Sequence, residues 1–351
     1  YGDSVGLSRN FTILDDGDSD SLINEVIREI DPDFFKSKEN PKAKPIKGLI
    51  SYARNVMIPV DEIAKGRYPS NRELLANIGD FAREYQEVKL ERGLADYDDL
   101  LVYCLEVLSH NQEAAKYYQD RFSHILVDEY QDVNSLQAQI VDKIGINHQI
   151  MAVGDDAQCI YTWRGADLDQ IMGFPEKHPN TKIFKIETNY RSSPEILKLA
   201  NCILNNRDEE SSYSKILKPS RPHEGLPVVV PTMDGYQQAD YILSKVEQLV
   251  DNGAHYDDIA ILYRAHYHAM ELQVELSRRG LPFVITSGLR FFEQAHVKDL
   301  VAQIRFVANP KDVTAFMRFA CLLPKIGEKT ASKLLGIAEK ASRTKEIKVI
   351  D

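Results

Sequence analysis

Two short apolar runs, each ending in a pair of acids, constrain the fold of this chain more than any other feature. HILVDE (124–129) is followed by a helix-like segment, NSLQAQIVDKI (134–144), and then by QIMAVGDD (149–156). A third run, TKIFKIET (181–188), comes later. Short apolar strands that alternate with helices are typical of a parallel α/β sheet. We therefore expect both acidic pairs at the carboxyl ends of parallel strands, the edge at which α/β proteins bind ligands.

The rest of the chain separates into helical and α/β parts. In the first third, apolar residues recur at the spacing of helices in three segments, 22–30, 74–88 and 100–108. A second α/β set has strand candidates at 226–231, 257–264 and 281–286, with helical patterns between them at 235–253 and 269–280. After Phe291 the pattern is helical to the end of the chain.

Composition narrows the class of protein. Of the 351 residues, 43% are hydrophobic and 27% charged, which is ordinary for a globular protein of about two or three domains. No apolar run approaches the ~20 residues of a membrane span, and the four cysteines form no C-x-x-C pair. We expect a reducing, cytoplasmic compartment and no membrane partner. The net charge of -10 argues against a histone-like coating protein, although a local groove could still bind nucleic acid.

The first acidic pair admits two interpretations. Strands commonly end in solvated acids, and Asp128 and Glu129 alone fit that description. Alternatively, Asp128 holds Mg²⁺, usually through water, and Glu129 positions and deprotonates the water that attacks a phosphate. The continuation Tyr130-Gln131-Asp132 makes the second pattern more specific.

The segment GDDAQCIYTWRGA (154–166) combines a phosphate-sensing candidate with a stacking candidate. The amide of Gln158 could sense a terminal phosphate and couple its loss to neighbouring groups. Tyr161, Trp163 and Arg164 could form a platform for stacked bases. The alternative is that Trp163 fills the core and Arg164 makes a surface ion pair, but the polar and glycine neighbours of Trp163 weaken the core interpretation.

A third segment, ETNYRSSPEIL (187–197), places Arg191 just before a predicted helix. Pro194 and the two serines before it are typical of a helix N-terminus. Arg191 could act as an arginine finger, and Tyr190 could stack on an adenine. A helix cap with a surface arginine is the alternative.

Taken together, DEYQD, GDDAQCIYTWRGA and NYRSS resemble, in order and spelling, the UvrD/Rep/PcrA family of superfamily 1 DNA helicases. NFTILDD, LISYARN and DYDDLL resemble the helical subdomain inserted in the first motor domain of that family, and IAILYRAH resembles the second motor domain. GLRFFEQAHVKDL and LLPKIGEKTASKLL resemble the subdomain inserted in the second motor domain. The similarity therefore covers nearly all of the chain.

The resemblance implies an α/β fold of the P-loop NTPase (RecA-like) type, with tandem motor domains and inserted helical subdomains, present only in part. The subdomain inserted in the first motor domain would occupy 1–120, and the C-terminal part of that motor domain 121–186. The N-terminal part of the second motor domain would occupy 187–290. The start of its own inserted subdomain would occupy 291–351.

The resemblance also implies roles at the nucleotide. Asp128 would bind the metal and Glu129 would be the base. Gln158 and Arg191 would contact the γ-phosphate of ATP, and Tyr190 would contact the adenine.

On the DNA side, the residues implied to contact single-stranded DNA are Tyr97, Tyr161, Trp163, Arg164 and Arg264. Tyr97 stands where the family often has Phe, and His266 stands where it usually has Asn. Gly327, with Lys325 and Lys329 beside it, resembles a turn whose backbone N–H groups touch duplex phosphates.

The function implied is that of an ATP-dependent 3′-to-5′ DNA helicase or translocase of DNA repair or replication. Its cofactors would be ATP and Mg²⁺. Its partners would be single-stranded DNA, junctions of single- and double-stranded DNA, and repair or replication proteins. Its location would be the bacterial cytosol or nucleoid.

One part of such a motor is not in the sequence. The phosphate loop G-x-x-x-x-G-K-[ST] is absent, since no Gly-Lys dipeptide occurs and the segment 327–330 lacks the first glycine. Tyr1 replaces an initiator Met, and no terminal signal precedes Asp351. We interpret both ends as internal to a longer protein, and expect this polypeptide alone not to hydrolyse ATP at the rate of a helicase.

Two other functions stay open on the sequence. The chain could be the motor part of a helicase-nuclease related to AddA and RecB, which a C-terminal nuclease site would reveal. It could also be a non-catalytic DNA-binding or scaffold relative that has lost its phosphate loop. Retention of Asp128, Glu129, Gln158 and Arg191 argues against that last alternative, because an inactive site has no physical need of all four.

Overall fold

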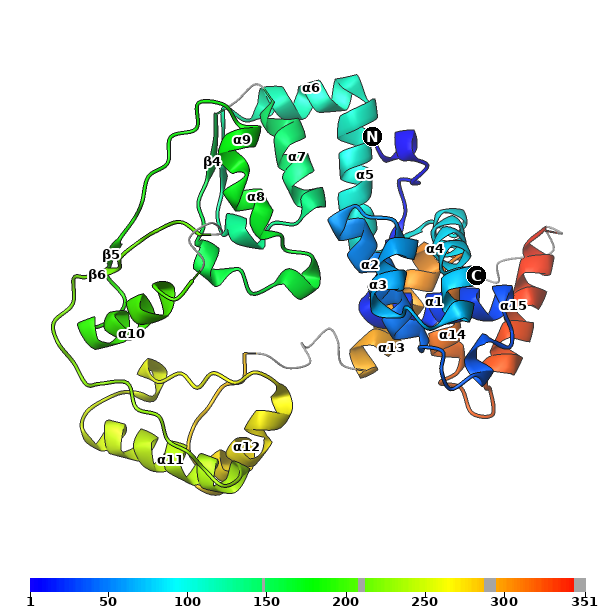
Figure 1. Ribbon diagram of the computed structural model, residues 1–351. Helices are drawn as coiled ribbons and strands as arrows, with labels where there is room; N and C mark the ends of the chain where they lie inside the picture. The colour runs from blue at the N-terminus through cyan, green and yellow to red at the C-terminus, as the bar shows by residue number, and fades with distance from the viewer. Residues whose placement is uncertain (147–148, 208–211, 287–294, 344–351) are drawn as a thin grey trace. The chain divides into compact units, whose positions relative to one another are not determined.

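The computed structural model describes residues 1–146, 149–207, 212–286 and 295–343 (Figure 1). Contacts divide the chain into two compact units. The first unit comprises Tyr1–Ile186, Leu204–Lys215 and Ala295–Asp351. The second comprises Glu187–Ile203 and Ile216–Gln294.

The first unit begins with a group of helices. They are α1 (Asp16–Ile30), α2 (Ala43–Val56), α3 (Val60–Arg67), α4 (Arg72–Glu91), α5 (Tyr97–His110) and α6 (Gln112–Arg121). Side-chain caps start several of them: Asp15 accepts from the Asp18 N–H in α1, and Asn71 accepts from the Leu74 N–H in α4. The predicted helical patterns of the first third are thus confirmed.

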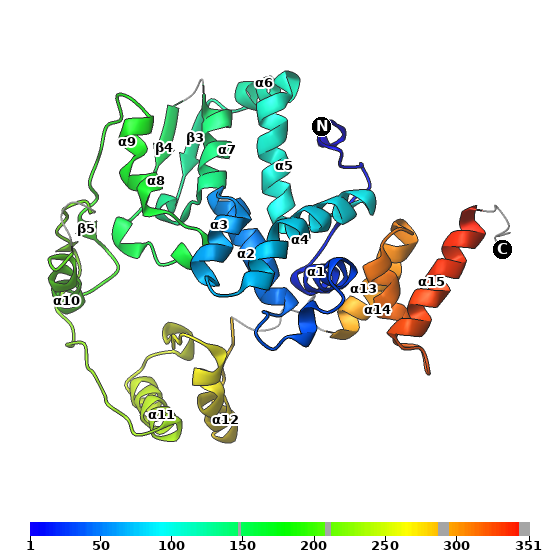
Figure 2. The same cartoon turned by 45° about the vertical axis from the view of Figure 1, so that its right-hand side comes forward.

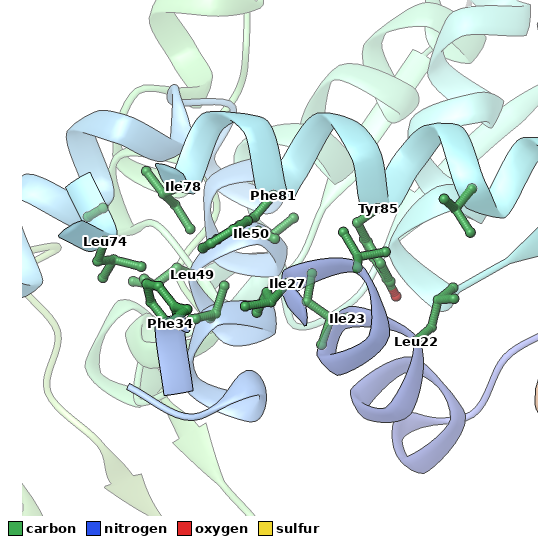
Figure 3. Close-up of a cluster of buried hydrophobic side chains, with 14 of the residues drawn as sticks. Leu22, Ile23, Ile27, Phe34, Leu49, Ile50, Leu74, Ile78, Phe81 and Tyr85 are labelled. Carbon is green, nitrogen blue, oxygen red and sulfur yellow. The ribbon is translucent and has the colours of Figure 1, made fainter. Parts of the chain in front are cut away.

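A single apolar core joins α1, α2 and α4 (Figure 3). Its fully buried members include Leu22, Ile23 and Ile27 of α1, Leu49 of α2, and Leu74, Ile78, Phe81 and Tyr85 of α4. Phe34, from the short turn η2 (Phe34–Lys36), meets Phe81 edge to face with ring centroids 5.2 Å apart. Strands β1 (Thr12–Ile13), before α1, and β2 (Leu94–Ala95), after α4, pair in parallel.

The predicted parallel strands are confirmed as β3 (His124–Val127) and β4 (Gln149–Ala152), which pair in register from His124↔Gln149 to Val127↔Ala152. Helix α7 (Ser135–Gly145) connects them, and α8 (Leu168–Met172) and α9 (Phe174–Lys177) follow. Residues of these helices pack with Val127, Ile150 and Ala152 on one face of the pair. On the other face, Leu126 and Met151 are 70% and 54% exposed.

Three further helices belong to the first unit: α13 (Ala295–Ala308), α14 (Val313–Ala320) and α15 (Glu328–Arg343). Lys298 of α13 pairs with Asp15 at 2.8 Å, and Arg305 bonds to Asp18 of α1 and to Asp312 before α14. Among the described residues, no helix combines the length and the apolarity that crossing a bilayer demands.

The second unit contains α10 (Pro194–Leu204), which ends at the unit boundary, α11 (Gly235–Asp251) and α12 (Met270–Arg278). Helices α11 and α12 confirm the predicted helical patterns and pack through Ala239, Leu243, Leu272 and Leu276. Strands β5 (Thr188–Asn189) and β6 (Lys218–Pro219) form a short parallel pair. The remaining 3₁₀ turns of the two units are η1 (Gly2–Val5), η3 (Tyr130–Asp132), η4 (Asp156–Gln158), η5 (Thr162–Arg164), η6 (Tyr256–Asp258) and η7 (His266–Ala269).

The strand predictions after residue 180 differ from the structure. Within the described part of the chain, 226–231, 257–264 and 281–286 form no strand, and of 181–188 only Thr188 lies in one. A strand exists only where a neighbouring backbone supplies ladder hydrogen bonds, and these segments have no such neighbour among the described residues. Several of their apolar side chains are exposed, and Phe184, Val229 and Leu262 are more than 80% exposed, whereas Ile261 and Leu281 pack against the core of α11 and α12.

Candidate active site

Asp128 and Glu129 directly follow β3 at its carboxyl end, and both are exposed. Glu129 has φ 51° and ψ 41°, in the left-handed region that a non-glycine residue adopts at a cost of about 1–3 kcal/mol. The Glu129 N–H donates to the Asp128 carboxylate (2.9 Å), and the Tyr130 N–H donates to the carbonyl of Val153 (2.8 Å). The turn is therefore held in a strained form that presents Glu129 at the edge of the sheet.

Gln131 connects this turn to the end of β4, a role that the sequence analysis missed. Its side chain is buried, its Nε2 donates to the Glu129 carboxylate (2.7 Å), and its Oε1 accepts from the Asp155 N–H (2.9 Å). A Cβ at Gly154 would lie 2.7 Å from that Oε1, so the close approach requires glycine. The only signal in the sequence was the position of Gln131 within DEYQD.

Gln158 joins the same hydrogen-bonded chain. It is exposed, and its Nε2 donates to the carboxylate of Asp155 (2.9 Å). Lys215 also bonds to Asp155. Burial raises the pKa of Asp155, but the hydrogen bonds from Gln158 and Lys215 outweigh it and hold this pKa below its usual value. The structure thus links Glu129 and Gln158 through Gln131 and Asp155.

Asp156 anchors a second segment to this loop and was also missed. Its carboxylate pairs with Lys215 (2.8 Å) and with Arg207 (2.7 Å), from the part of the first unit formed by Leu204–Lys215. Hydrogen bonds from both cations hold the pKa of Asp156 below its usual value, although burial acts the other way. The sequence could not indicate these pairs, because about 50 or more residues separate the partners.

Tyr161, Trp163 and Arg164 form one exposed cluster, which we call the aromatic platform. The rings of Tyr161 and Trp163 have centroids 6.4 Å apart, and the Arg164 guanidinium lies 4.7 Å from the centroid of Trp163. Trp163 is 58% exposed. The alternative that Trp163 fills the core is therefore wrong, and the geometry suits stacking of bases.

Tyr190 and Arg191 lie in the second unit, directly after β5. The Asn189 side chain accepts from the N–H groups of Arg191 (3.0 Å) and Ser192 (2.8 Å), which shapes the start of α10. Tyr190 is 76% exposed, and Arg191 is exposed as well. Arg264, also in the second unit, is exposed. The roles of these three side chains stay predictions.

The other predicted DNA-contacting residues lie in the first unit. Tyr97 is the first residue of α5 and is 61% exposed. Lys325, Gly327 and Lys329 are exposed around the start of α15, and Lys325 has φ 69°. The Gly327 carbonyl accepts from the N–H groups of Thr330 and Ala331. The DNA contacts of Tyr97, Lys325, Gly327 and Lys329 stay predictions.

Asp128 fits the role of a ligand in a magnesium–nucleotide complex. Among the residues that the structure describes, no group of three or more His, Cys, Asp or Glu side chains could hold an ion. Mg²⁺ in nucleotide sites needs only one or two carboxylates, because phosphates and water fill its other positions. A single exposed carboxylate at the carboxyl end of β3 is sufficient for that purpose.

Comparison with known proteins agrees with the motifs. Residues 1–179 match the model of the UvrD/REP helicase N-terminal domain, and residues 184–350 match that of the UvrD-like helicase C-terminal domain. The chain is 32% identical over 332 residues to the ATP-dependent DNA helicase PcrA of Bacillus subtilis, covering 93% of the chain and 43% of that relative.

Two other relatives give the same picture. A probable DNA helicase II homologue of Mycoplasma capricolum is 30% identical over 339 residues, covering 96% of the chain and 46% of that protein. PcrA of Leuconostoc citreum is 30% identical over 319 residues, covering 90% of the chain and 41% of that protein. The chain thus spans less than half the length of these relatives. The predicted resemblance and the α/β, P-loop NTPase fold class are confirmed, and this chain belongs to the UvrD/Rep family of DNA helicases.

Proposed function

We propose that the chain is part of the motor of an ATP-dependent DNA helicase or translocase that moves 3′ to 5′ on single-stranded DNA. The observation that carries this proposal is the hydrogen-bonded chain Glu129–Gln131–Asp155–Gln158 at the carboxyl ends of β3 and β4. The loop that holds Gln158 continues directly into the aromatic platform. With Gln158 as a sensor of the γ-phosphate and the platform as a stacking surface, one loop would connect ATP hydrolysis to movement on DNA.

At the nucleotide, Asp128 would hold Mg²⁺, which neutralises charge on the phosphates when bound. Glu129 would accept a proton from the attacking water, and Gln131 would hold the Glu129 carboxylate in place. Gln158 and Arg191 would contact the γ-phosphate. Tyr190 would stack on the adenine.

At the DNA, sequence-independent stacking and backbone contacts would dominate, since aromatic rings accept any base. The residues proposed to contact single-stranded DNA are Tyr97, Tyr161, Trp163, Arg164 and Arg264. Lys325, Gly327 and Lys329 would contact duplex phosphates at a junction of single- and double-stranded DNA. We place the activity in DNA repair or replication in the cytoplasm, with proteins of those processes as partners.

The direct test is ATP hydrolysis by the full-length protein that carries this chain, with and without single-stranded DNA. We expect DNA to stimulate hydrolysis, and the 351-residue polypeptide alone to show no hydrolysis at a helicase-like rate, because no phosphate loop occurs in it. A full-length protein that binds DNA without hydrolysing ATP would instead indicate a non-catalytic relative. Robust DNA-stimulated hydrolysis by the isolated polypeptide would contradict the expectation that hydrolysis needs a phosphate loop, which this sequence does not contain.

Trp163→Ala is expected to weaken binding of single-stranded DNA by about 5- to 150-fold, since a stacked base contributes ~1–3 kcal/mol. It is also expected to uncouple DNA from ATP hydrolysis. Fluorescence anisotropy of a labelled oligothymidylate measures the first effect in the full-length protein. Trp163→Phe, which keeps a ring, serves as the control and should retain most of the affinity. Unchanged affinity of Trp163→Ala for the oligonucleotide would show that the aromatic platform does not bind single-stranded DNA.

Gln131→Met is expected to lower kcat for ATP hydrolysis about 10- to 100-fold, the range for losing a hydrogen-bond partner that orients a metal ligand. KM for ATP should change little, because Gln131 is buried and would not touch the nucleotide. Gln131→Glu should be impaired at least as much, since it places a second carboxylate beside Glu129. Gln139→Met, an exposed position on α7, is the matched control. A wild-type kcat in Gln131→Met would show that the hydrogen bond from Gln131 is not needed to position the Glu129 carboxylate.

A further inference from the structure

The start of α5 carries three acids around one exposed aromatic residue, in the sequence Asp96-Tyr97-Asp98-Asp99. Asp96 and Asp99 form a capping box, each accepting from the backbone N–H of the other. Both also accept from Lys89 Nζ, at 2.6 Å each, although Lys89 is fully buried. Tyr97 is left in solvent, 61% exposed.

A second cation completes this buried cluster. Arg54, near the end of α2, lies 2.7 Å from the Asp99 carboxylate, and the Tyr85 hydroxyl donates to Asp96 (3.0 Å). Burial raises the pKa of Asp96, but the neighbouring Lys89 and Arg54 lower it to about 2, so the carboxylate is ionised at neutral pH. Two cations thus face two anions inside the helical part of the unit.

Such a cluster needs an explanation other than stability. Removing four charges from water costs about as much as their attraction returns, and apolar residues of similar volume often do as well or better. What hydrogen-bonded charges add is a defined geometry, because each partner must sit in one place. The element whose geometry this cluster defines is the first turn of α5, where Tyr97 is exposed.

Asn55, the neighbour of Arg54, extends this geometry to the aromatic platform. Its Nδ2 donates to the Asp98 carboxylate (2.7 Å), and its Oδ1 accepts from Asn134 Nδ2 (2.8 Å). Asn134 caps α7 and forms a β-bridge with Ala166, the last residue of the segment 154–166 that carries the aromatic platform, which we call the platform loop. One half-buried amide therefore bonds to the first turn of α5 and to the residue that holds the platform loop.

The platform loop also packs directly on the end of α2. Gly165, which follows Arg164, has φ 91°, and a Cβ placed on it would lie 3.1 Å from Val56 and 3.5 Å from the Cβ of Asn55. Helices α2, α5 and α7 contact one another (Figure 2). The platform loop thus packs against Asn55, the residue that also bonds to the first turn of α5.

We propose that Asn55 is a positioning residue that holds Tyr97 in register with the aromatic platform, so that one segment of single-stranded DNA contacts both. The inference rests on the proposed function and deepens it: the DNA-binding surface runs from the motor part of the unit onto its helical part. Tyr97 and Trp163 are both well exposed, and Asn55 bonds to Asp98, next to Tyr97, and to Asn134, which bridges Ala166 at the end of the platform loop. Asn55 itself acts through these two elements.

The test uses the full-length protein and labelled oligothymidylates of about 4 and about 16 nucleotides, spanning the usual site sizes for single strands. In anisotropy titrations, Asn55→Ala is expected to weaken binding of the longer oligonucleotide at least about fivefold, as Tyr97→Ala does. Binding of the shorter one, which the platform alone can hold, should change less than about twofold in both variants. The double variant Asn55→Ala/Tyr97→Ala should be no weaker than Tyr97→Ala alone.

Asp98→Ala provides a second route, because it removes only the α5 end of the bridge and leaves the bond between Asn55 and Asn134. Asp98→Ala should reproduce the loss of affinity for the longer oligonucleotide. It therefore keeps the test open should thermal unfolding show that Asn55→Ala does not fold. Asn77→Ala on α4, a half-buried amide that bonds to Asp31, is the matched control and should bind like wild type.

The outcomes separate the inference from the function on which it rests. Additive losses in the double variant, equal losses for both oligonucleotide lengths, or wild-type binding by folded Asn55→Ala and Asp98→Ala would each overturn the positioning role. Absence of binding to either oligonucleotide by the wild-type protein would instead refute the proposed DNA-binding function.

Discussion

Glu129→Gln in the full-length protein is expected to lower the rate of ATP hydrolysis by about 10²- to 10⁴-fold, the usual contribution of a general base. The glutamine amide keeps the shape of the side chain, and its oxygen can still accept from Gln131 Nε2. It cannot take the proton of the attacking water. ATP binding should therefore persist while hydrolysis is lost.

Single-turnover hydrolysis and equilibrium nucleotide binding measure the two halves of this expectation. Glu62→Gln, at an exposed position of α3, removes the same charge elsewhere in the unit and should behave like wild type. Hydrolysis at the wild-type rate in Glu129→Gln would show that another group takes the proton. Loss of ATP binding in that variant would assign Glu129 to binding rather than to the reaction.

Arg191→Ala is expected to lower the rate of hydrolysis by about 10³- to 10⁵-fold, the range for arginine fingers in NTPases. Asn189 holds the Arg191 backbone, and the Arg191 side chain is exposed, so truncation should not disturb the start of α10. Arg191→Lys should rescue little, because an ammonium group lacks the planar fork that contacts two phosphate oxygens.

Steady-state hydrolysis at saturating DNA measures the effect, and thermal unfolding verifies that each variant is folded. Arg278→Ala on α12 is the control, since it removes an exposed arginine of the same unit. If the rate of hydrolysis falls by less than about tenfold, Arg191 is a surface arginine at a helix cap, the alternative that the sequence leaves open.

Local patterns were sufficient to predict helices α1, α4, α5, α7, α11 and α12 and the strand pair β3–β4, and they named the candidate site residues. The apolar periodicity of α1 and α4, the strand pair β3–β4 and the spelling around Asp128 and Trp163 all depend on residues close together in the chain. A helix or a strand end that displays its own side chains can be predicted from such a window. Exposure of Trp163 beside Arg164 agrees with the prediction made from its polar neighbours.

Other strand predictions failed because a strand depends on its neighbours. The segments 226–231 and 281–286 have the apolar character of buried strands, yet in the described chain they lack the backbone partners that would make a ladder. Side-chain pattern alone does not supply those hydrogen bonds.

By itself, the sequence determined the family, the strand pair β3–β4 with the helix between its strands, and the residues placed at the carboxyl ends of those strands. Only the tertiary structure showed that Gln131 joins Glu129 to the Gln158 loop and that Asn55 joins the α5 turn to the platform loop. The reason is physical: a hydrogen bond depends on distance in space, and Asn55 and Asn134 are 79 residues apart in the chain. Asp128 and Glu129 could be identified from their motif, whereas the amide of Gln131 that bonds to Glu129 and the amide of Asn55 that bonds to Asp98 and Asn134 were identified only in the folded chain.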